Sequence, residues 1–471
     1  MSATFGQFRA QAAQALADPR LQRALEGATG NFQRGRVQAL AALPEAEALR
    51  DHLKAIRAAT LARLADHLET FESQAQAAGA QVHWARGPAE AARIVTRIAH
   101  QHGAQTAVKS KSMVSEEIHL NRALRAAGVT PVETDLGEWL IQLAGDPPSH
   151  IIAPAIHKTR QECAELLSRE AGRPLSPDDI PALTAEARRL LREQFLAAGV
   201  GISGVNLAVA ESGSVVLVTN EGNGRMVTSL PPVHVAIMGI EKLVPSWDDA
   251  AVWLALLAPS ATGQPISVYT TVITGPARPG DPDGPQEVHI VILDNKRSQM
   301  VGTVFEEALQ CIRCGACLNA CPVYKEAGGH AYGSPYSGPI GAVISPLLFG
   351  MEQYAALPYA SSLCGACLEV CPARIDLPRL LLELRAQEVE ANLLPGWERT
   401  LERAVAAGLA RPGLFRWLAR LARALQTPLA RGGFLRLPRR LNPGGERRLP
   451  ALARRSFREL WEQGMKEHNE P

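Results

Sequence analysis

Cysteine thiolates are the side chains of this sequence with the most specific chemistry. Seven of the eight cysteines fall in two arrays in the carboxyl-terminal third of the chain. Such clustering, in a long chain whose start reads as a helix and not as a secretion signal, favours metal binding over disulfides. The first array has the spacing C-x2-C-x2-C-x3-C-P and comprises Cys311, Cys314, Cys317 and Cys321. The second has the spacing C-x2-C-x3-C-P and comprises Cys364, Cys367 and Cys371.

The first spacing is that of two-cluster bacterial ferredoxins, in which the fourth cysteine ligates the other cluster. Gly315 permits the tight turn by which three thiolates cap three corners of one cubane, and Pro322 suits the first turn of a following helix. We therefore expect two [4Fe–4S] clusters. Because the last cysteine of each array is expected to ligate the cluster of the other array, the first cluster takes Cys311, Cys314, Cys317 and Cys371. The second cluster takes Cys321, Cys364 and Cys367.

The fourth ligand of the second cluster falls on Ser361, three residues before Cys364. This corner is either completed by the serine or water, or left open, as in a [3Fe–4S] cluster formed in part of the molecules. The alternative to iron is zinc, which favours two CxxC pairs around one ion and fits these arrays poorly. The remaining Cys163 lies on an expected helix and reads as a small buried hydrophobe.

The arrays must be positioned by the elements around them, and four parts are expected: a helical region (1–60), an α/β domain (61–300), a mainly α ferredoxin-like domain (301–394) and a basic tail (395–471). In the α/β part, short apolar runs alternate with helical patterns, which favours a largely parallel sheet covered on both faces. The expected strands are 106–108, 151–153, 207–209, 214–218, 233–238 and 288–293. The expected helices are 61–78, 89–102, 116–127, 159–170, 184–198 and 247–257.

Composition is that of a globular protein, with 46% hydrophobic and 20% charged residues. No uninterrupted apolar stretch approaches the roughly 20 residues of a membrane span, and we expect a cytoplasmic protein. The net charge of +2 hides an asymmetry, because the segment from Arg403 onward holds 15 Lys/Arg against 5 Asp/Glu. Its Arg-rich stretch around Trp417 predicts either a helix packed on the body or a partner, or peripheral contact with an anionic membrane. Nothing resembles a nucleic-acid module.

Polar residues of the α/β domain suggest a site for a small anion. Lys109 follows an expected strand, where α/β sheets place their ligands. Glu211 belongs to a small-residue turn between strands whose amides could cradle a carboxylate. Asn223 and Arg225 lie in a glycine-containing loop, and the arginine offers a bidentate fork. The alternative is that all four are structural residues of turns and helix entrances.

The order of several motifs resembles the lactate utilization protein B family. The motifs are Lys109–Ser112 followed by Glu116-Glu117, Ala210–Ser214, Thr219–Arg225, Leu230–His234 and Asp294–Ser298, joined to both cysteine arrays and a closing 449–461 segment. This resemblance implies an α/β fold like that of CoA transferases and sugar-phosphate isomerases. It also implies an electron-transfer role in converting L-lactate to pyruvate, beside a cysteine-rich subunit and a second lactate-utilisation-domain protein.

Two other functions fit the same arrays. One is an iron–sulfur subunit for another 2-hydroxy acid or for glycerol 3-phosphate. The other is a redox sensor that responds to oxygen through the weak corner at Ser361. No G-x-G-x-x-G follows an expected strand, so the sequence carries no flavin or nicotinamide motif that we would trust, and no catalytic residue is assigned.

Overall fold

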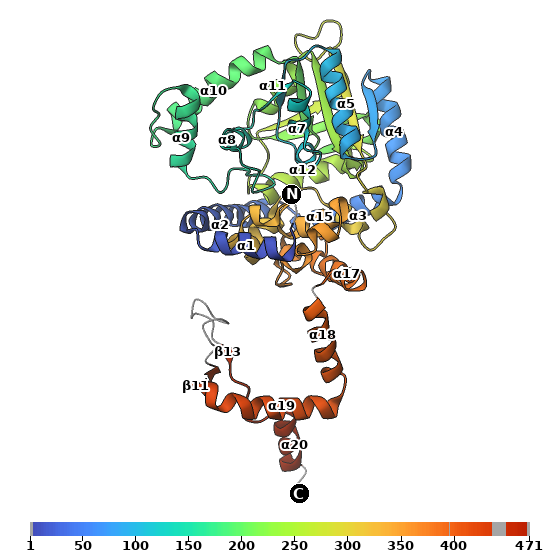
Figure 1. Ribbon diagram of the computed structural model, residues 1–471. Coiled ribbons are helices and arrows are strands. Elements are labelled where there is room, and N and C mark those ends of the chain that lie inside the picture. The colour runs from blue at the N-terminus through green and yellow to red at the C-terminus, as the bar shows by residue number, and fades with distance from the viewer. Residues whose placement is uncertain (1–2, 395, 436–448, 469–471) are drawn as a thin grey trace. The chain divides into compact units, whose positions relative to one another are not determined.

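The computed structural model describes residues 3–394, 396–435 and 449–468, and the chain forms two compact units, Met1–Ala391 and Asn392–Pro471 (Figure 1). The larger unit contains both cysteine arrays and two sheets. Three of the four parts expected from the sequence thus lie within one unit. The exact four-part division stays a prediction.

A six-stranded parallel sheet forms the centre of the α/β part, in the order β1-β10-β7-β4-β2-β3. Its strands are β1 (Gln81–Ala85), β2 (Thr106–Lys109), β3 (Thr130–Glu133), β4 (Val200–Gly204), β7 (Val233–Gly239) and β10 (Glu287–Leu293). All seven residues of β7 are buried, and its side chains alternate between two cores: Val235 faces one and Ala236 the other. Burial on both faces is typical of a parallel sheet covered by helices.

A second, mixed sheet has the order β8-β5-β6-β9 and was not anticipated from the sequence. It comprises β5 (Leu207–Val209), β6 (Ser214–Thr219), β8 (Leu243–Val244) and β9 (Tyr269–Ile273). The expected α/β class with a parallel sheet is confirmed. The expected strand at 151–153 is wrong, because Ile151 and its neighbours form bends in a connection that reaches the cysteine region.

Seventeen α-helices are described in the larger unit. Before the second sheet they are α1 (Phe5–Leu16), α2 (Pro19–Ala42), α3 (Ala46–Ala62), α4 (Leu64–Ala77), α5 (Pro88–Gln101), α6 (Met113–Glu117), α7 (Leu120–Ala126), α8 (Leu136–Ala144), α9 (Arg160–Ala171) and α10 (Ile180–Ala197). Between strands of the second sheet come α11 (Asn223–Ser229) and α12 (Trp247–Ala261), and after it come α13 (Ala316–Ala320), α14 (Pro322–Ala327), α15 (Gly338–Phe349), α16 (Ala366–Val370) and α17 (Leu377–Glu390). Helices α5, α6 and α7 cover one face of the parallel sheet, and α8–α10 cover its β2–β3 end.

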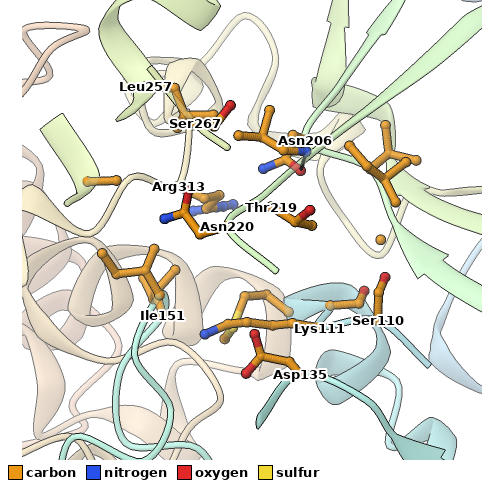
Figure 2. Close-up of a pocket in the computed structure, with 18 of the residues that line it drawn as sticks. Ser110, Lys111, Asp135, Ile151, Asn206, Thr219, Asn220, Leu257, Ser267 and Arg313 are labelled. Carbon is orange, nitrogen blue, oxygen red and sulfur yellow. Dashed lines mark hydrogen bonds between the residues drawn. The ribbon is translucent and has the colours of Figure 1, made fainter. Parts of the chain in front are cut away.

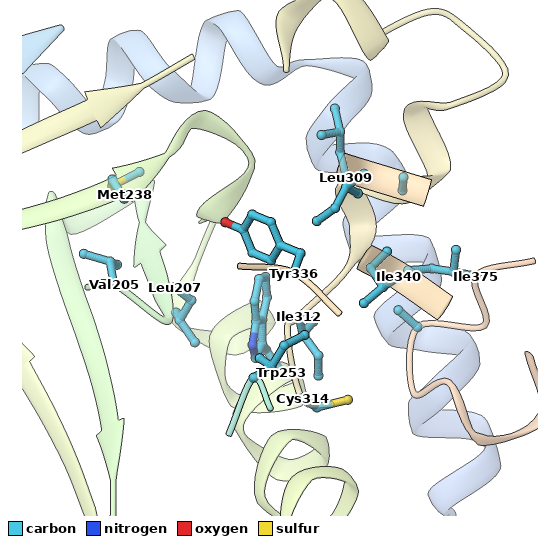
Figure 3. Close-up of a cluster of buried hydrophobic side chains, with 14 of the residues drawn as sticks. Val205, Leu207, Met238, Trp253, Leu309, Ile312, Cys314, Tyr336, Ile340 and Ile375 are labelled. Atoms are coloured by element: carbon cyan, nitrogen blue, oxygen red, sulfur yellow. The ribbon is translucent and has the colours of Figure 1, made fainter. Parts of the chain in front are cut away.

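The opposite face of the parallel sheet belongs to one continuous core that reaches the cysteines. Figure 3 shows Leu207 and Trp253 of the α/β part beside Ile312, Cys314 and Tyr336 of the cysteine region. Helices α1, α2 and α3 do not form a separate N-terminal body, since α2 packs on both α12 and α13. The cysteine region is therefore held by the α/β part and by the N-terminal helices together.

The smaller unit contains α18 (Gly396–Leu409), α19 (Pro412–Gln426), α20 (Phe457–His468) and three two-residue strands, β11 (Ala430–Arg431), β12 (Phe434–Leu435) and β13 (Leu449–Pro450). Arg423 of α19 pairs with Glu459 of α20 at 2.8 Å. No residue of α19 is buried, and its aromatic Trp417 is 59% exposed. The helix predicted around Trp417 is thus present, and what it contacts stays a prediction. Among the described residues, no helix has the length and hydropathy needed to cross a bilayer.

Candidate metal centre and adjoining cavity

The two cysteine arrays adopt the same local structure. Gly315 and Gly365 both have left-handed backbone (φ 78° and 84°), and each is followed by a short helix, α13 or α16. This conformation favours glycine, so the turn expected at Gly315 is present in both arrays. Cys321 precedes α14 with Pro322 in its first turn, also as expected. Cys364 is exposed and Cys311 half-buried, whereas the other five cysteines of the arrays are buried.

The seven thiols interact electrostatically in two sets. Burial raises the pKa of Cys317, and the neighbouring thiols Cys311, Cys314 and Cys371 raise it further. Burial likewise raises the pKa of Cys367 to about 12, and here the contributing thiols are Cys321 and Cys364. Each set mixes residues of both arrays, which is the crossed arrangement expected of two-cluster ferredoxins.

The spacing of the sulfur atoms suits clusters better than zinc. Among the described residues, no three of these sulfurs lie within 4.8 Å of one another. Zinc–sulfur bonds of about 2.3 Å would bring tetrahedral thiolates to roughly 3.8 Å apart. A cubane instead spreads its thiolates over separate corners. The donor set therefore fits iron–sulfur clusters.

Ser361 lies in a loop held by an arginine. Its hydroxyl accepts a hydrogen bond from the Leu363 N–H (3.1 Å), and its carbonyl accepts one from Arg385 Nη2 (3.3 Å). Arg385 Nε also donates to the Pro358 carbonyl at 2.9 Å. The loop preceding Cys364 is thus positioned by α17, whatever completes the corner.

The N-terminal helices bring arginines to the first set of thiols, a feature that sequence reasoning missed. Arg50 of α3 donates to the Cys371 carbonyl at 2.9 Å. The pKa of Arg36 is lowered by burial and by Arg50, while Cys314 and Cys371 act in the opposite direction. Fully buried Arg57 donates to the Leu309 carbonyl, two residues before Cys311, at 3.0 Å. These contacts could not be foreseen from the sequence, because the arginines lie far from the cysteines in the chain and nothing local marks an arginine as the neighbour of a cluster.

A cavity of about 380 Å³ adjoins the first array (Figure 2). It lies where parallel strands end, since Lys111 follows β2, Asn206 follows β4 and Lys242 follows β7. Ligands of parallel α/β sheets bind at this edge. Arg313 of the first array completes the wall, and its backbone N–H donates to Cys311 Sγ at 3.4 Å.

The structure does not gather the four residues predicted to bind an anion. Asn223 alone lines the cavity. Arg225 is exposed, and its nearest carboxylate is Asp283 at 4.0 Å. Glu211 accepts a hydrogen bond from the Trp247 N–H (2.8 Å) at the start of α12. The turn containing Glu211 packs tightly, because a Cβ on Gly213 (φ 64°) would meet the Ala75 nitrogen at 2.1 Å.

Lys109 is fully buried and already neutralised. Its Nζ lies 2.5 Å from Glu133 Oε1 and 2.7 Å from Asn121 Oδ1. Burial disfavours the charge, but Glu133 and Glu116 outweigh that cost and raise the pKa of Lys109. Two residues on, Lys111 occupies the cavity wall. Residues two apart share a face within a strand, but β2 ends at Lys109, so the sequence alone did not tell which lysine faces a ligand.

Comparison with known proteins places this architecture in a family. A LUD domain model matches residues 68–293, and a 4Fe-4S dicluster domain model matches residues 307–375. Lactate utilization protein B of Geobacillus kaustophilus is 44% identical over 453 residues, covering 94% of this chain and 95% of the relative. The chain belongs to the lactate utilization protein B family.

Other members of the lactate utilization protein B family match equally broadly. The Exiguobacterium sp. protein is 47% identical and covers 88% of this chain and 89% of its own length. The Bacillus licheniformis protein is 41% identical, with 98% of both chains covered. The dicluster match spans all seven array cysteines, so an iron–sulfur component is supported. The resemblance and the α/β-plus-dicluster fold expected from the sequence are both confirmed.

Proposed function

We propose that this chain is a cytoplasmic iron–sulfur protein that transfers electrons during the oxidation of L-lactate to pyruvate. One observation carries the electron-transfer part: seven thiols from two arrays fall into two crossed sets within a 4Fe-4S dicluster match. The lactate part rests on the name shared by relatives that cover almost the whole chain. Two companion subunits, one cysteine-rich and one with its own lactate-utilisation domain, belong to the same proposal.

In this proposal Cys311, Cys314, Cys317 and Cys371 hold the first cluster. Cys321, Cys364 and Cys367, with Ser361 or an open corner, hold the second. When bound, such clusters accept and release single electrons at potentials set by charge, hydrogen bonds and exposure. The residues of this chain supply those influences unequally. The first set has buried Arg50 and half-buried Arg36 around it, whereas the second includes the exposed Cys364.

The test is an electron paramagnetic resonance experiment on the full-length protein, purified without oxygen together with its companion subunits. Added L-lactate should produce the signals of reduced clusters. D-lactate, 2-hydroxybutyrate and glycerol 3-phosphate, each at the same concentration, should produce signals no larger than these. Reduction by dithionite but never by L-lactate would overturn the lactate assignment. Zinc without acid-labile sulfide would overturn the cluster assignment as well.

A further inference from the structure

The cavity beside the first cysteine array is lined by cationic side chains, of which Lys111 and Arg313 each have a buried donor atom that has no hydrogen-bond partner among the described residues. We propose that it binds the carboxylate of a short 2-hydroxy or 2-oxo acid, with Lys111 and Arg313 as the charged donors. The choice of acid rests on the proposed function, whereas the anion site itself rests on the geometry alone.

Two buried donor atoms carry this inference. Among the described residues, neither Lys111 Nζ nor Arg313 Nη1 has a hydrogen-bond partner. The carboxylate nearest to Lys111 Nζ is Glu138 Oε1, at 3.9 Å, beyond hydrogen-bonding distance. Buried charged donors without partners are costly, and folded proteins rarely retain them without a ligand or ordered water. Lys111 comes from the end of β2 and Arg313 from the cysteine loop, so an anion would bridge the two parts of the unit.

Each acidic residue of the cavity wall has a protein partner, and Glu241 shares one of the two donors, because Arg313 Nη2 donates to its Oε1. Glu241 pairs with Arg297 at 2.7 Å and lies 3.5 Å from Arg313. Asp135 accepts the Glu138 N–H (3.1 Å) as the N-cap of α8. Glu221 accepts the Leu136 N–H at 3.2 Å, and burial followed by Asp135 raises its pKa to about 7. An incoming carboxylate thus meets free donors, while these acids keep protein partners.

The rest of the wall suits a short organic acid. The amide side chains Asn206, Asn220 and Asn223 line the cavity, and the Asn223 Oδ1 has no hydrogen-bond partner among the described residues, so it can accept from a hydroxyl. Figure 2 shows Asn206, Asn220 and Arg313 around the same cavity as Ile151 and Leu257. Binding sites typically combine an apolar wall with a few polar groups that orient the ligand. The apolar side chains give room for an alkyl group longer than methyl.

The position of Arg313 ties this site to the first cluster. Its side chain faces the cavity, and its backbone N–H donates to Cys311 Sγ at 3.4 Å. A bound anion adds negative charge close to that ligand and disfavours adding an electron to the cluster. By thermodynamic reciprocity, reducing the first cluster must weaken anion binding by the same factor. The site thus releases an acid more easily once the cluster has been reduced.

The test is anaerobic titration calorimetry of the cluster-loaded full-length protein with L-lactate, pyruvate, 2-hydroxybutyrate and inorganic phosphate. We expect saturable binding of the three acids, at least tenfold weaker binding of phosphate, and a loss of at least tenfold in affinity for Lys111→Met. Lys111→Arg should retain most of the affinity because it keeps the charge. The matched control is Lys296→Met, at an exposed lysine outside the cavity. Iron content and circular dichroism establish that each variant is folded.

Three results would overturn the carboxylate site: no saturable binding, equal binding by Lys111→Met, or phosphate binding as tightly as the acids. Equal affinity in the oxidised and the dithionite-reduced protein would overturn its placement beside the first cluster. The two proposals fail separately. If the acids bind but L-lactate never reduces the clusters with all subunits present, the proposed anion site is supported and the proposed lactate function is wrong. If L-lactate reduces the clusters equally well in Lys111→Met, the proposed lactate function is supported and the proposed anion site is wrong.

Discussion

Arg297 and Glu117 form a two-pronged ion pair that is almost fully buried, with Nη1–Oε1 and Nη2–Oε2 distances of 2.8 and 2.7 Å. Glu117 lies in α6 of the α/β part, and Tyr336 of the cysteine region donates to its Oε2 at 2.6 Å. Arg297 Nε also lies 2.7 Å from Glu241. Burial disfavours the charge of Glu117, but Arg297 outweighs it and lowers the pKa of this carboxyl. This network joins the α/β part to the cysteine region.

Removing the shared cation should therefore be costly. Arg297→Leu leaves Glu117 without its cation and Glu241 with only the more distant Arg313, all buried. Breaking a buried pair from one side costs about 3–5 kcal/mol. We expect a loss of that size in the free energy of unfolding, measured by anaerobic urea denaturation. Arg278→Leu, at an exposed arginine, is the control and should change it by less than about 0.5 kcal/mol. Equal stability of the two variants would refute the role of the network.

The crossed ligand sets predict a separation of effects between the arrays. Cys371→Ser, in the second array, should perturb the first cluster, and Cys321→Ser, in the first array, should perturb the second. The reason is that each of these thiols interacts electrostatically with the opposite array. Electron paramagnetic resonance of the dithionite-reduced variants, with iron analysis, distinguishes the two signals. Cys163→Ser on α9 should leave both unchanged. If each array serine altered only its own array's cluster, the crossed assignment would be wrong.

Ser361 offers a direct test of the incomplete corner. Ser361→Cys places a thiol where the ferredoxin pattern has its fourth ligand, so the second cluster should lose iron more slowly in air. Ser361→Ala should accelerate that loss if the hydroxyl is a ligand, and leave it unchanged if the corner is open. The measurement is the time course of cluster absorbance and iron release after exposure to oxygen. No difference among the three proteins would mean that residue 361 does not face the cluster.

The arginines beside the first set of thiols predict a tuned potential for the first cluster. Arg36 Nη2 donates to the Val370 carbonyl at 3.0 Å, and its charge acts on Cys314 and Cys371. Arg36→Gln keeps a hydrogen-bond donor but removes the positive charge. That charge stabilises the reduced cluster, which is more negative than the oxidised one. We expect the midpoint potential of that cluster to fall by on the order of 50 mV, about tenfold in a one-electron equilibrium. Exposed Arg34→Gln is the control, and a potentiometric titration makes the comparison. An unchanged or raised potential would contradict the assignment.

Glu388 should make stability depend on pH. It is fully buried on α17, neither carboxyl oxygen has a hydrogen-bond partner among the described residues, and burial raises its pKa to about 8. The folded protein therefore holds a proton that the unfolded chain releases near pH 4.5, so Glu388 lowers stability progressively from about pH 4.5 to 8. Glu388→Gln should be more stable than the parent by roughly 2–4 kcal/mol above pH 8, and little different at pH 5.

The measurement is the apparent Tm of both proteins, without oxygen, across pH 5–9. Glu383→Gln, on the same helix at a partly exposed position, is the control and should follow the parent at every pH. Parallel curves for Glu388→Gln and its parent would show that the pKa of Glu388 is the same in the folded and the unfolded protein, and would contradict the prediction.

The features that the sequence determined by itself are those encoded by neighbours along the chain. The spacing of the cysteines, the glycine turn at Gly315 and the proline after Cys321 give the same local structure wherever the loop lies. Strands such as Val233–Gly239 are also evident, because a continuous apolar run is buried on both faces. Short or polar strands such as Gln81–Ala85 were not predicted. They form because they pair with a distant strand, and no local pattern marks them.

Only the tertiary structure decided which residues meet. It placed Arg36, Arg50 and Arg57 beside cysteines roughly 300 positions away, and it brought Arg313 to the same cavity as Lys111. It also separated Lys109, Glu211 and Arg225, which the sequence had grouped by residue type. The physical reason is that a site is assembled where strand ends and loops converge. That convergence depends on strand order and packing, which act between residues far apart in the chain.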